Sequence, residues 1–259
     1  MRRISVLAGL FGIAFSGFLC ANVPLSFAMK ISGSFAMKIS GAKAGGLNWQ
    51  EARGTMWNGA LSGVVFQGRQ SLGTIGLKAK PLAFLRDQVG YEFDWQSLAG
   101  QGAGNIFWGF GTIRVSDLDL RLQLAALADL RPDVRDTNSS VIIENASVSL
   151  KDQNCSTAAG ALSSDVLAKL ALRFNASATE LTGNINCNDG DVQVLMQGQL
   201  GQSDVVTGDA RVRLNSASSF KAHVQTNDVA LGLGLAQYGF TEDATGYVFQ
   251  QEAILLEGL

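Results

Sequence analysis

Histidine is nearly absent from this chain, because His223 is the only one among 259 residues. A lone histidine is more often a surface or core side chain than a general base. Without a second histidine the chain offers none of the common catalytic zinc sites. Asp117 and Asp119 share one face of an expected strand with other polar side chains, which indicates a solvated surface rather than an acid–base pair. We therefore expect no catalytic residues, no metal site and no cofactor, and the chain is not predicted to be an enzyme.

Charge and proline are also scarce. Only 16% of the residues are charged and the formal net charge is −2, so the chain lacks the basic surface that binds nucleic acid. Nucleic acid is therefore excluded from the expected partners. The 3 prolines, set against 30 glycines, indicate many tight turns rather than disordered linkers.

Cysteine is limited to three residues. Cys20 lies inside a long apolar run, where a cysteine acts as a small hydrophobic side chain. The other two, Cys155 and Cys187, do not form the C-x-x-C motif that is typical of thiol exchange. In an oxidising compartment two such cysteines pair. We predict a structural disulfide between them, with Cα atoms no more than about 7 Å apart.

One long hydrophobic run is present at residues 4–29, directly after Met1, Arg2 and Arg3. A helix needs roughly 20 apolar residues to cross the hydrocarbon of a bilayer. The apolar region of a signal peptide is shorter, about 7–15 residues, so the length favours an uncleaved transmembrane helix; a cleaved signal peptide is the alternative. Both interpretations export the remaining chain. The basic residues on the two flanks nearly balance, and the cysteine pair favours the exported side.

These features divide the chain into three parts. Residues 1–29 are expected to be a cytoplasmic stub with the membrane anchor, residues 30–53 a connector, and residues 54–259 a periplasmic β domain. The octapeptide SFAMKISG occurs twice in tandem, at 26–33 and 34–41. It lengthens the connector and is too short for a solenoid repeat.

From residue 61 onward the hydrophobic pattern has a period of two, which is typical of half-buried strands. The apolar residues of 89–95 are expected on one face. The alternation changes parity between Val115 and Leu118, which predicts a bulge or bend around Ser116. Strands spaced by roughly 8–12 residues, without long helices, predict an all-β fold: mainly an antiparallel meander, as a curved sheet or a partly closed barrel. The expected strands are 59–67, 71–79, 89–95, 105–124, 141–145, 146–151, 170–176, 181–187, 192–199, 207–214 and 219–226; residues 81–88 and 124–131 are expected as short helical turns, and 163–172 as either helix or strand.

The stretch Gly54-Thr55-Met56-Trp57-Asn58-Gly59, followed by an apolar strand, resembles the G-T-aliphatic-W-x-G signature of the type II secretion system protein N family (GspN). The resemblance continues through residues 75–85, which include Pro81, and through the segments around Cys155 and Cys187. The anchor, the β domain and the cysteine pair occur in the same order as in the family. The resemblance therefore covers most of the chain.

The resemblance implies an accessory component of the general (type II) secretion pathway. Such a component is held in the bacterial cell inner membrane by a single span, has the bulk of its chain in the periplasm, and supports export of folded proteins across the outer membrane. The implied partners are other secretion components, on the inner-membrane platform or on the secretin side. Trp57 is expected either to close the end of the core or to anchor a partner. The implied interaction residues are Gly54, Thr55, Trp57, Gly59 and Pro81.

A second hypothesis follows from a distant similarity of this family to AsmA-type proteins, whose long curved sheets present an apolar groove associated with lipid handling. It implies a lipid-binding or lipid-transfer module of the cell envelope, and it predicts a continuous, uncovered apolar face on one side of the sheet. A generic exported adhesin or scaffold is a third hypothesis. Two features depart from the family: Gly76 stands where an aromatic residue is expected, and the tandem octapeptide is an addition.

Overall fold

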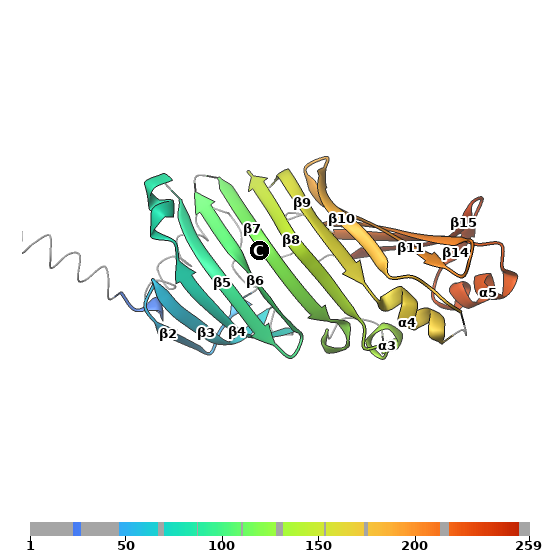
Figure 1. The fold of residues 1–259 in the computed structure, drawn as a ribbon, viewed down its shortest axis with the longest axis horizontal. Coiled ribbons are helices and arrows are strands. Elements are labelled where there is room, and N and C mark those ends of the chain that lie inside the picture. The colour runs from blue at the N-terminus through green and yellow to red at the C-terminus, as the bar shows by residue number, and fades with distance from the viewer. Residues whose placement is uncertain are drawn as a thin grey trace, which may run out of the picture.

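The structure is a computed structural model, and its described residues form one long β-sheet (Figure 1). Residues 1–22, which include Cys20, lie outside the described part, as does the tandem octapeptide apart from Ser26. Within the described part no helix has the length and apolar character needed to cross a membrane. The described residues are 23–26, 47–66, 70–86, 88–109, 111–127, 132–152, 154–173, 176–212 and 218–253.

Strands follow one another along the chain, and a few short helices lie at the ends of the strands (Figure 1). The strands are β1 (Leu47–Asn48), β2 (Glu51–Gly54), β3 (Asn58–Phe66), β4 (Gln70–Ala79), β5 (Val89–Ser97), β6 (Gly100–Gly109), β7 (Thr112–Gln123), β8 (Ser140–Lys151), β9 (Asn154–Ser164), β10 (Leu181–Asn188), β11 (Asp191–Leu200), β12 (Asp204–Val212), β13 (Ser218–Gln225), β14 (Thr241–Asp243) and β15 (Gly246–Ala253). The helices are η1 (Pro81–Arg86), η2 (Leu124–Ala126), α3 (Pro132–Arg135), α4 (Val166–Leu172) and α5 (Val229–Gln237).

The sheet is an antiparallel meander. From β3 to β13 each strand pairs with the next strand in sequence, after which come β15 and, at the edge, β14. At the other edge β1 and β2 both pair with β3. The all-β prediction is confirmed, and of its two predicted forms the open, curved sheet is observed (Figure 1). The first strands, β1 and β2, lie within 30–53, the range expected to be a connector.

The two faces of the sheet differ in polarity because successive side chains along a strand point to opposite faces. The apolar residues of 89–95 share one face, as predicted, while the side chains between them are exposed. On this face Trp95 is buried and its Nε1–H donates to the backbone carbonyl of Leu72 on β4. We call this side the apolar face and the opposite side the polar face. The register places on the apolar face Leu61, Ile75, Leu77, Phe93, Trp95, Ile106, Trp108, Leu118, Leu120, Ile143, Val148, Ile185, Val194, Val206, Val224 and Phe249.

The predicted bulge in β7 is confirmed. The β7–β8 register shifts between Val115 and Leu118, and Asp117 adopts a positive φ of 52°. The neighbouring strand β8 has its own shift, at Asn145, whose φ is 48° and whose backbone N–H donates to Oδ1 of Asp119 at 2.9 Å. Adjacent bulges increase local twist and bend. Asp119 therefore stabilises a bend of the sheet, in addition to lying on its polar face.

Several predicted elements differ from the structure. The strand predicted at 170–176 is wrong, because its first residues belong to α4. Within the described part β1, β2, β9, β14, β15, α3 and α5 were not predicted. The single strand predicted at 105–124 is wrong, because β6 ends at Gly109 and β7 begins at Thr112 and pairs back against it. The two strands predicted at 141–145 and 146–151 are one strand, β8. The helical turn expected at 81–88 is confirmed as η1. The sequence of β9, NCSTAAGALSS, contains one large apolar residue, which explains why its strand pattern is weak.

Two small cores lie at opposite parts of the sheet. One contains Leu61 and Val64 of β3, together with Leu25 from the range expected to be the anchor. The other lies where α4 and α5 cover one end of the apolar face, and its buried members include Leu200 and Val206. Figure 1 shows α3 and α4 at the same end of the strands, with α5 near β14. Much of the apolar face between these cores is only half-buried.

Asp165, which precedes α4, connects this helix to the start of β8. Its carboxylate accepts the backbone N–H of Ser140 at 2.7 Å and forms an ion pair with Lys169 at 2.8 Å. Partial burial raises the pKa of Asp165, but the hydrogen bonds from Lys169 and Ser140 and the lysine charge outweigh it, so the pKa lies below its usual value. A lowered pKa means that the stabilisation is present at neutral pH and is lost as the pH falls through that pKa.

We predict that Asp165→Asn lowers the free energy of unfolding by about 1 kcal/mol at pH 7, because a charged partner is lost. Urea unfolding at pH 7 and at about pH 3 measures this difference. The gap between wild type and variant should narrow at the lower pH, as protonation of the wild-type carboxyl begins to remove the charged partner. The control is Glu180→Gln at an exposed site, which should match wild type at both pH values. A gap that persists unchanged at low pH would contradict the ionic origin.

Candidate functional site

The family motif forms the corner between β2 and β3. Gly54 and Gly59 are register partners, so the four residues between them make a tight reversal. The Thr55 backbone N–H donates to the Asn58 carbonyl at 3.0 Å. Its hydroxyl oxygen accepts from the backbone N–H groups of Trp57 and Asn58, each at 3.3 Å. Thr55 therefore fixes the corner through its own side chain, as is typical of turns that contain Ser or Thr.

Both glycines of the motif are required by geometry. Gly54 has a φ of +84°, a left-handed conformation that side chains with a Cβ rarely adopt. A Cβ on Gly59 would lie 2.6 Å from the carbonyl oxygen of Arg53 and 2.8 Å from Cδ2 of Leu25. The spacing of the two glycines thus reflects one left-handed residue and one close approach of neighbouring chain segments.

Residues 23–26 pack against this corner. The Met56 backbone N–H donates to the carbonyl of Val23 at 3.0 Å, and Pro24 forms an isolated bridge with Thr55. Leu25 is 2% exposed and packs in the core that contains Leu61 and Val64. The end of the range expected to be the anchor is therefore part of the folded domain.

Trp57 is half-buried, so its ring does not act as a fully buried plug of the core. Its backbone carbonyl accepts the N–H of Ala79 at 2.8 Å, which connects the motif to the end of β4. Pro81 follows two residues later and begins η1. The structure thus brings the motif and Pro81 to the same end of the sheet.

Two exposed leucines accompany Pro81. Leu82 is 75% exposed and Leu85 is 82% exposed, while Ala83 between them is buried. Sequence reasoning treated these leucines as part of a turn and missed their exposure. Large exposed apolar side chains are typical of interaction sites, and these two lie at the end of the sheet that carries the half-buried tryptophan. We call Trp57, Leu82 and Leu85 the corner surface.

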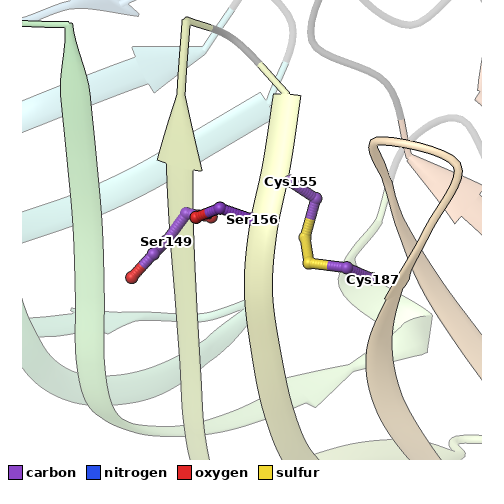
Figure 2. Close-up of a disulfide and its surroundings, with 4 residues drawn as sticks. All are labelled: Ser149, Cys155, Ser156 and Cys187. Atoms are coloured by element: carbon purple, nitrogen blue, oxygen red, sulfur yellow. A yellow bond between two sulfur atoms is a disulfide. The ribbon is translucent and has the colours of Figure 1, made fainter.

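The predicted disulfide is present. Cys155 and Cys187 are bonded, and their Cα atoms are 5.6 Å apart. Figure 2 shows the two side chains pointing toward each other from neighbouring strands, while the Ser156 hydroxyl donates to the Ser149 carbonyl on β8 at 2.9 Å. The backbone N–H of Cys155 also donates to the carbonyl of Gly190 at 2.6 Å. The disulfide connects the start of β9 to the end of β10, and the Cys155–Gly190 hydrogen bond connects it to the turn that follows β10.

His223 lies on the polar face, beside the β14–β15 turn. Its Nε2 is 3.1 Å from the Thr245 hydroxyl and 3.8 Å from a carboxylate oxygen of Asp243. Both groups contact the same ring nitrogen, whereas a catalytic triad has the acid on one nitrogen and the nucleophile on the other. The backbone N–H and the hydroxyl of Thr245 donate to Asp243 and hold the pKa of that carboxyl below its usual value. These contacts hold the β14–β15 turn against His223 on β13.

Comparison with known proteins identifies the family. The family model described as type II secretion system (T2SS), protein N, matches residues 45–250. The chain belongs to this family. The match contains the corner, η1, the disulfide and almost the whole sheet, and it makes the chain a type II secretion component. No curated protein and no solved structure matches the chain. Each protein N motif residue named from the sequence, namely Gly54, Thr55, Trp57, Gly59 and Pro81, lies inside the matched range.

Proposed function

We propose that this protein N family member is an accessory component of type II secretion that is anchored in the bacterial inner membrane and acts in the periplasm. It supports export of folded proteins across the outer membrane by binding other secretion components, on the inner-membrane platform or on the secretin side. The observation that carries the proposal is the family match over residues 45–250. The Cys155–Cys187 disulfide supports an oxidising compartment.

In this proposal the chain works by binding rather than by catalysis. The corner surface is the proposed contact with a secretion partner, because it combines a half-buried tryptophan with two exposed leucines on family-matched segments. Aromatic anchors of this kind contribute strongly to interfaces once water is excluded around them. The geometry at His223 supports a structural role for the only histidine.

Deleting the gene should leave exported enzymes trapped in the periplasm, and wild-type protein should restore their secretion. The combined variant Leu82→Ser with Leu85→Ser should stay folded, because both side chains are exposed, yet should fail to restore secretion and should lose crosslinks to secretion partners. Trp57→Ala should act in the same direction, with a stability loss of about 1–2 kcal/mol for a half-buried ring. The matched control is Leu98→Ser, which changes a 96% exposed leucine in the β5–β6 turn and should restore secretion fully.

A second candidate, an AsmA-like lipid-binding module, is favoured by one observation. The apolar face carries large exposed side chains between the two cores, among them Trp108, Ile113, Val212 and Phe220. An uncovered apolar face of this extent is typical of a surface that meets a partner or a lipid. Normal secretion in the deletion strain, together with phospholipid that copurifies with the protein, would replace the secretion role by this second function.

A further inference from the structure

A groove crosses the polar face in the second half of the sheet, far along the chain from the corner surface. It has a volume of about 980 Å³ and is lined by residues from β8 to the β14–β15 turn. Many of its lining residues belong to cross-strand rows, because register partners on neighbouring strands lie side by side. One complete row runs from β8 to β13 and consists of Glu144, Ala161, Asn184, Leu195, Asp209 and Lys221.

The adjoining row carries neutral hydrogen-bonding groups. Thr182, Gln197 and Thr207 are consecutive register partners in it, and His223 follows on β13. In the middle of the first row Leu195 is 46% exposed and offers an apolar contact. The groove thus combines hydroxyl and amide groups along its length with one apolar position at its centre.

The dimensions of the groove suit a linear ligand. The row from Glu144 to Lys221 spans six strands, and therefore five interstrand spacings of about 4.8 Å, or roughly 24 Å along the sheet. An extended polypeptide advances about 3.3 Å per residue, so about seven residues cover this length. Such a segment would lie across the strands and would be recognised by side chains, since the sheet's own backbone groups are used in its ladders.

The row carries a carboxylate, Glu144, at one end and an ammonium group, Lys221, at the other. The lining near Lys221 also includes Asp243, whose carboxylate accepts from the backbone N–H and the hydroxyl of Thr245. Within the part of the chain that the structure describes, the side chains of Glu144 and Lys221 form no ion pair and no hydrogen bond. Asp209 is the register partner of Lys221, but its carboxylate already has other partners. Gln193 Nε2 donates to both of its oxygens at 2.9 Å, and Arg211 forms an ion pair with it at 3.3 Å. A carboxylate without an ion-pair partner therefore lies at one end of the row, and an ammonium group without one lies at the other.

We propose that this groove binds an extended polypeptide segment of about seven residues, with a cationic side chain at the Glu144 end and an anionic side chain at the Lys221 end. A polypeptide supplies both charges on one linear chain, and its backbone amides match the hydroxyl and amide groups of the second row. Peptide binding goes beyond the secretion role and does not depend on it. It is measured on purified protein, so its failure is distinct from a normal secretion result in the deletion strain.

Fluorescence anisotropy with full-length protein in mild detergent tests this proposal. The probes are three fluorescein-labelled nonapeptides built from serine, threonine and valine. Each carries one charged residue near each end. The first peptide has Lys at one end and Glu at the other, the second has Lys at both ends, and the third has Glu at both ends. Wild type should bind the Lys/Glu peptide about tenfold more tightly than the other two. Lys221→Glu makes both ends of the row acidic, so this variant should prefer the Lys/Lys peptide by a similar factor.

The matched control is Arg121→Glu, which makes the same charge change on the polar face at β7, outside the groove. It should keep the wild-type preference. Equal binding of the three peptides, absence of saturable binding, or an unchanged preference in Lys221→Glu would each overturn the proposal. Saturable binding of N-acetylglucosamine tetramer, with no binding of any of the three peptides, would also overturn the proposal and would assign the groove to carbohydrate.

Glu144→Lys provides a second, independent variant. It makes both ends of the row basic, so it should prefer the Glu/Glu peptide. Far-UV circular dichroism checks that each variant is folded.

Discussion

Removing the disulfide, by combining Cys155→Ser with Cys187→Ser, should lower the free energy of unfolding by about 3–4 kcal/mol. The bond joins residues 32 positions apart, and a cross-link of this length restricts the unfolded chain by about that amount. Urea unfolding followed by circular dichroism measures the change. This is a large fraction of the stability of an ordinary domain.

The loss should be concentrated between β9 and β10. Their ladder runs from Leu181 paired with Ser164 to Asn184 paired with Ala161, which is four pairs, whereas β10 and β11 share seven. Beyond Asn184 the disulfide and the Cys155–Gly190 hydrogen bond close the far end. Hydrogen exchange in the double variant should therefore accelerate most in residues 185–188. The β11–β12 ladder should remain protected by comparison.

Cys20→Ser provides the control, since it removes a thiol and leaves the disulfide in place. It should unfold at the wild-type urea concentration. A double variant that matched wild type in both stability and exchange would show that the short ladder alone holds β9 against β10. Uniformly faster exchange across the whole sheet would show that the bond stabilises the domain globally and has no local effect.

How far the sequence predicts this fold depends on the size of the side chains in each strand. In β5 and β7 large apolar residues alternate with charged ones, so their faces and the bulge near Ser116 were predictable, although the turn between β6 and β7 was missed. In β9 the apolar face is made by small residues such as Ala158, and the alternation disappears. In α5 the glycines weaken the helical pattern, although Asp228 caps the helix by accepting from Ala230 and Leu231.

The departure at Gly76 has a local cause. Gly76 pairs with Asp94 on β5, and a Cβ at this position would collide with the Asp94 carboxylate. An aromatic side chain there requires that the exposed Asp94 side chain turns away. The change is therefore compatible with the family fold once the cross-strand neighbour is considered, which a single sequence does not reveal.

The corner was predictable as a motif, whereas the groove was not. The corner residues are contiguous in sequence, so their spacing alone identifies them. The groove assembles side chains from six strands between Glu144 and Lys221, and each of them looks in sequence like an ordinary residue on a solvated face. Only the register, set by the turns and bulges of the intervening strands, places them in one row.

Gly54→Ala should destabilise the domain by about 3 kcal/mol. The left-handed conformation costs an L-residue roughly 1–2 kcal/mol, and overpacking typically adds 1–3 kcal/mol. Both terms apply here, because φ is +84° and a Cβ would lie 2.5 Å from the carbonyl oxygen of Asn58 and 2.9 Å from Cα of Gly59. The clash is with backbone atoms, which cannot rotate away as a side chain does. Relief requires that the corner itself opens.

Gly201→Ala is the matched control, because it separates strain from crowding. Gly201 has a φ of +67° in the β11–β12 turn, but nothing lies within 4 Å of the position that its Cβ would occupy. Its loss should be limited to the conformational cost of about 1 kcal/mol. Urea unfolding of both variants gives the difference, about 2 kcal/mol, as the contribution of the tight corner. Equal losses would mean that the corner relaxes freely, and the first glycine of the motif would then be required for its conformation alone.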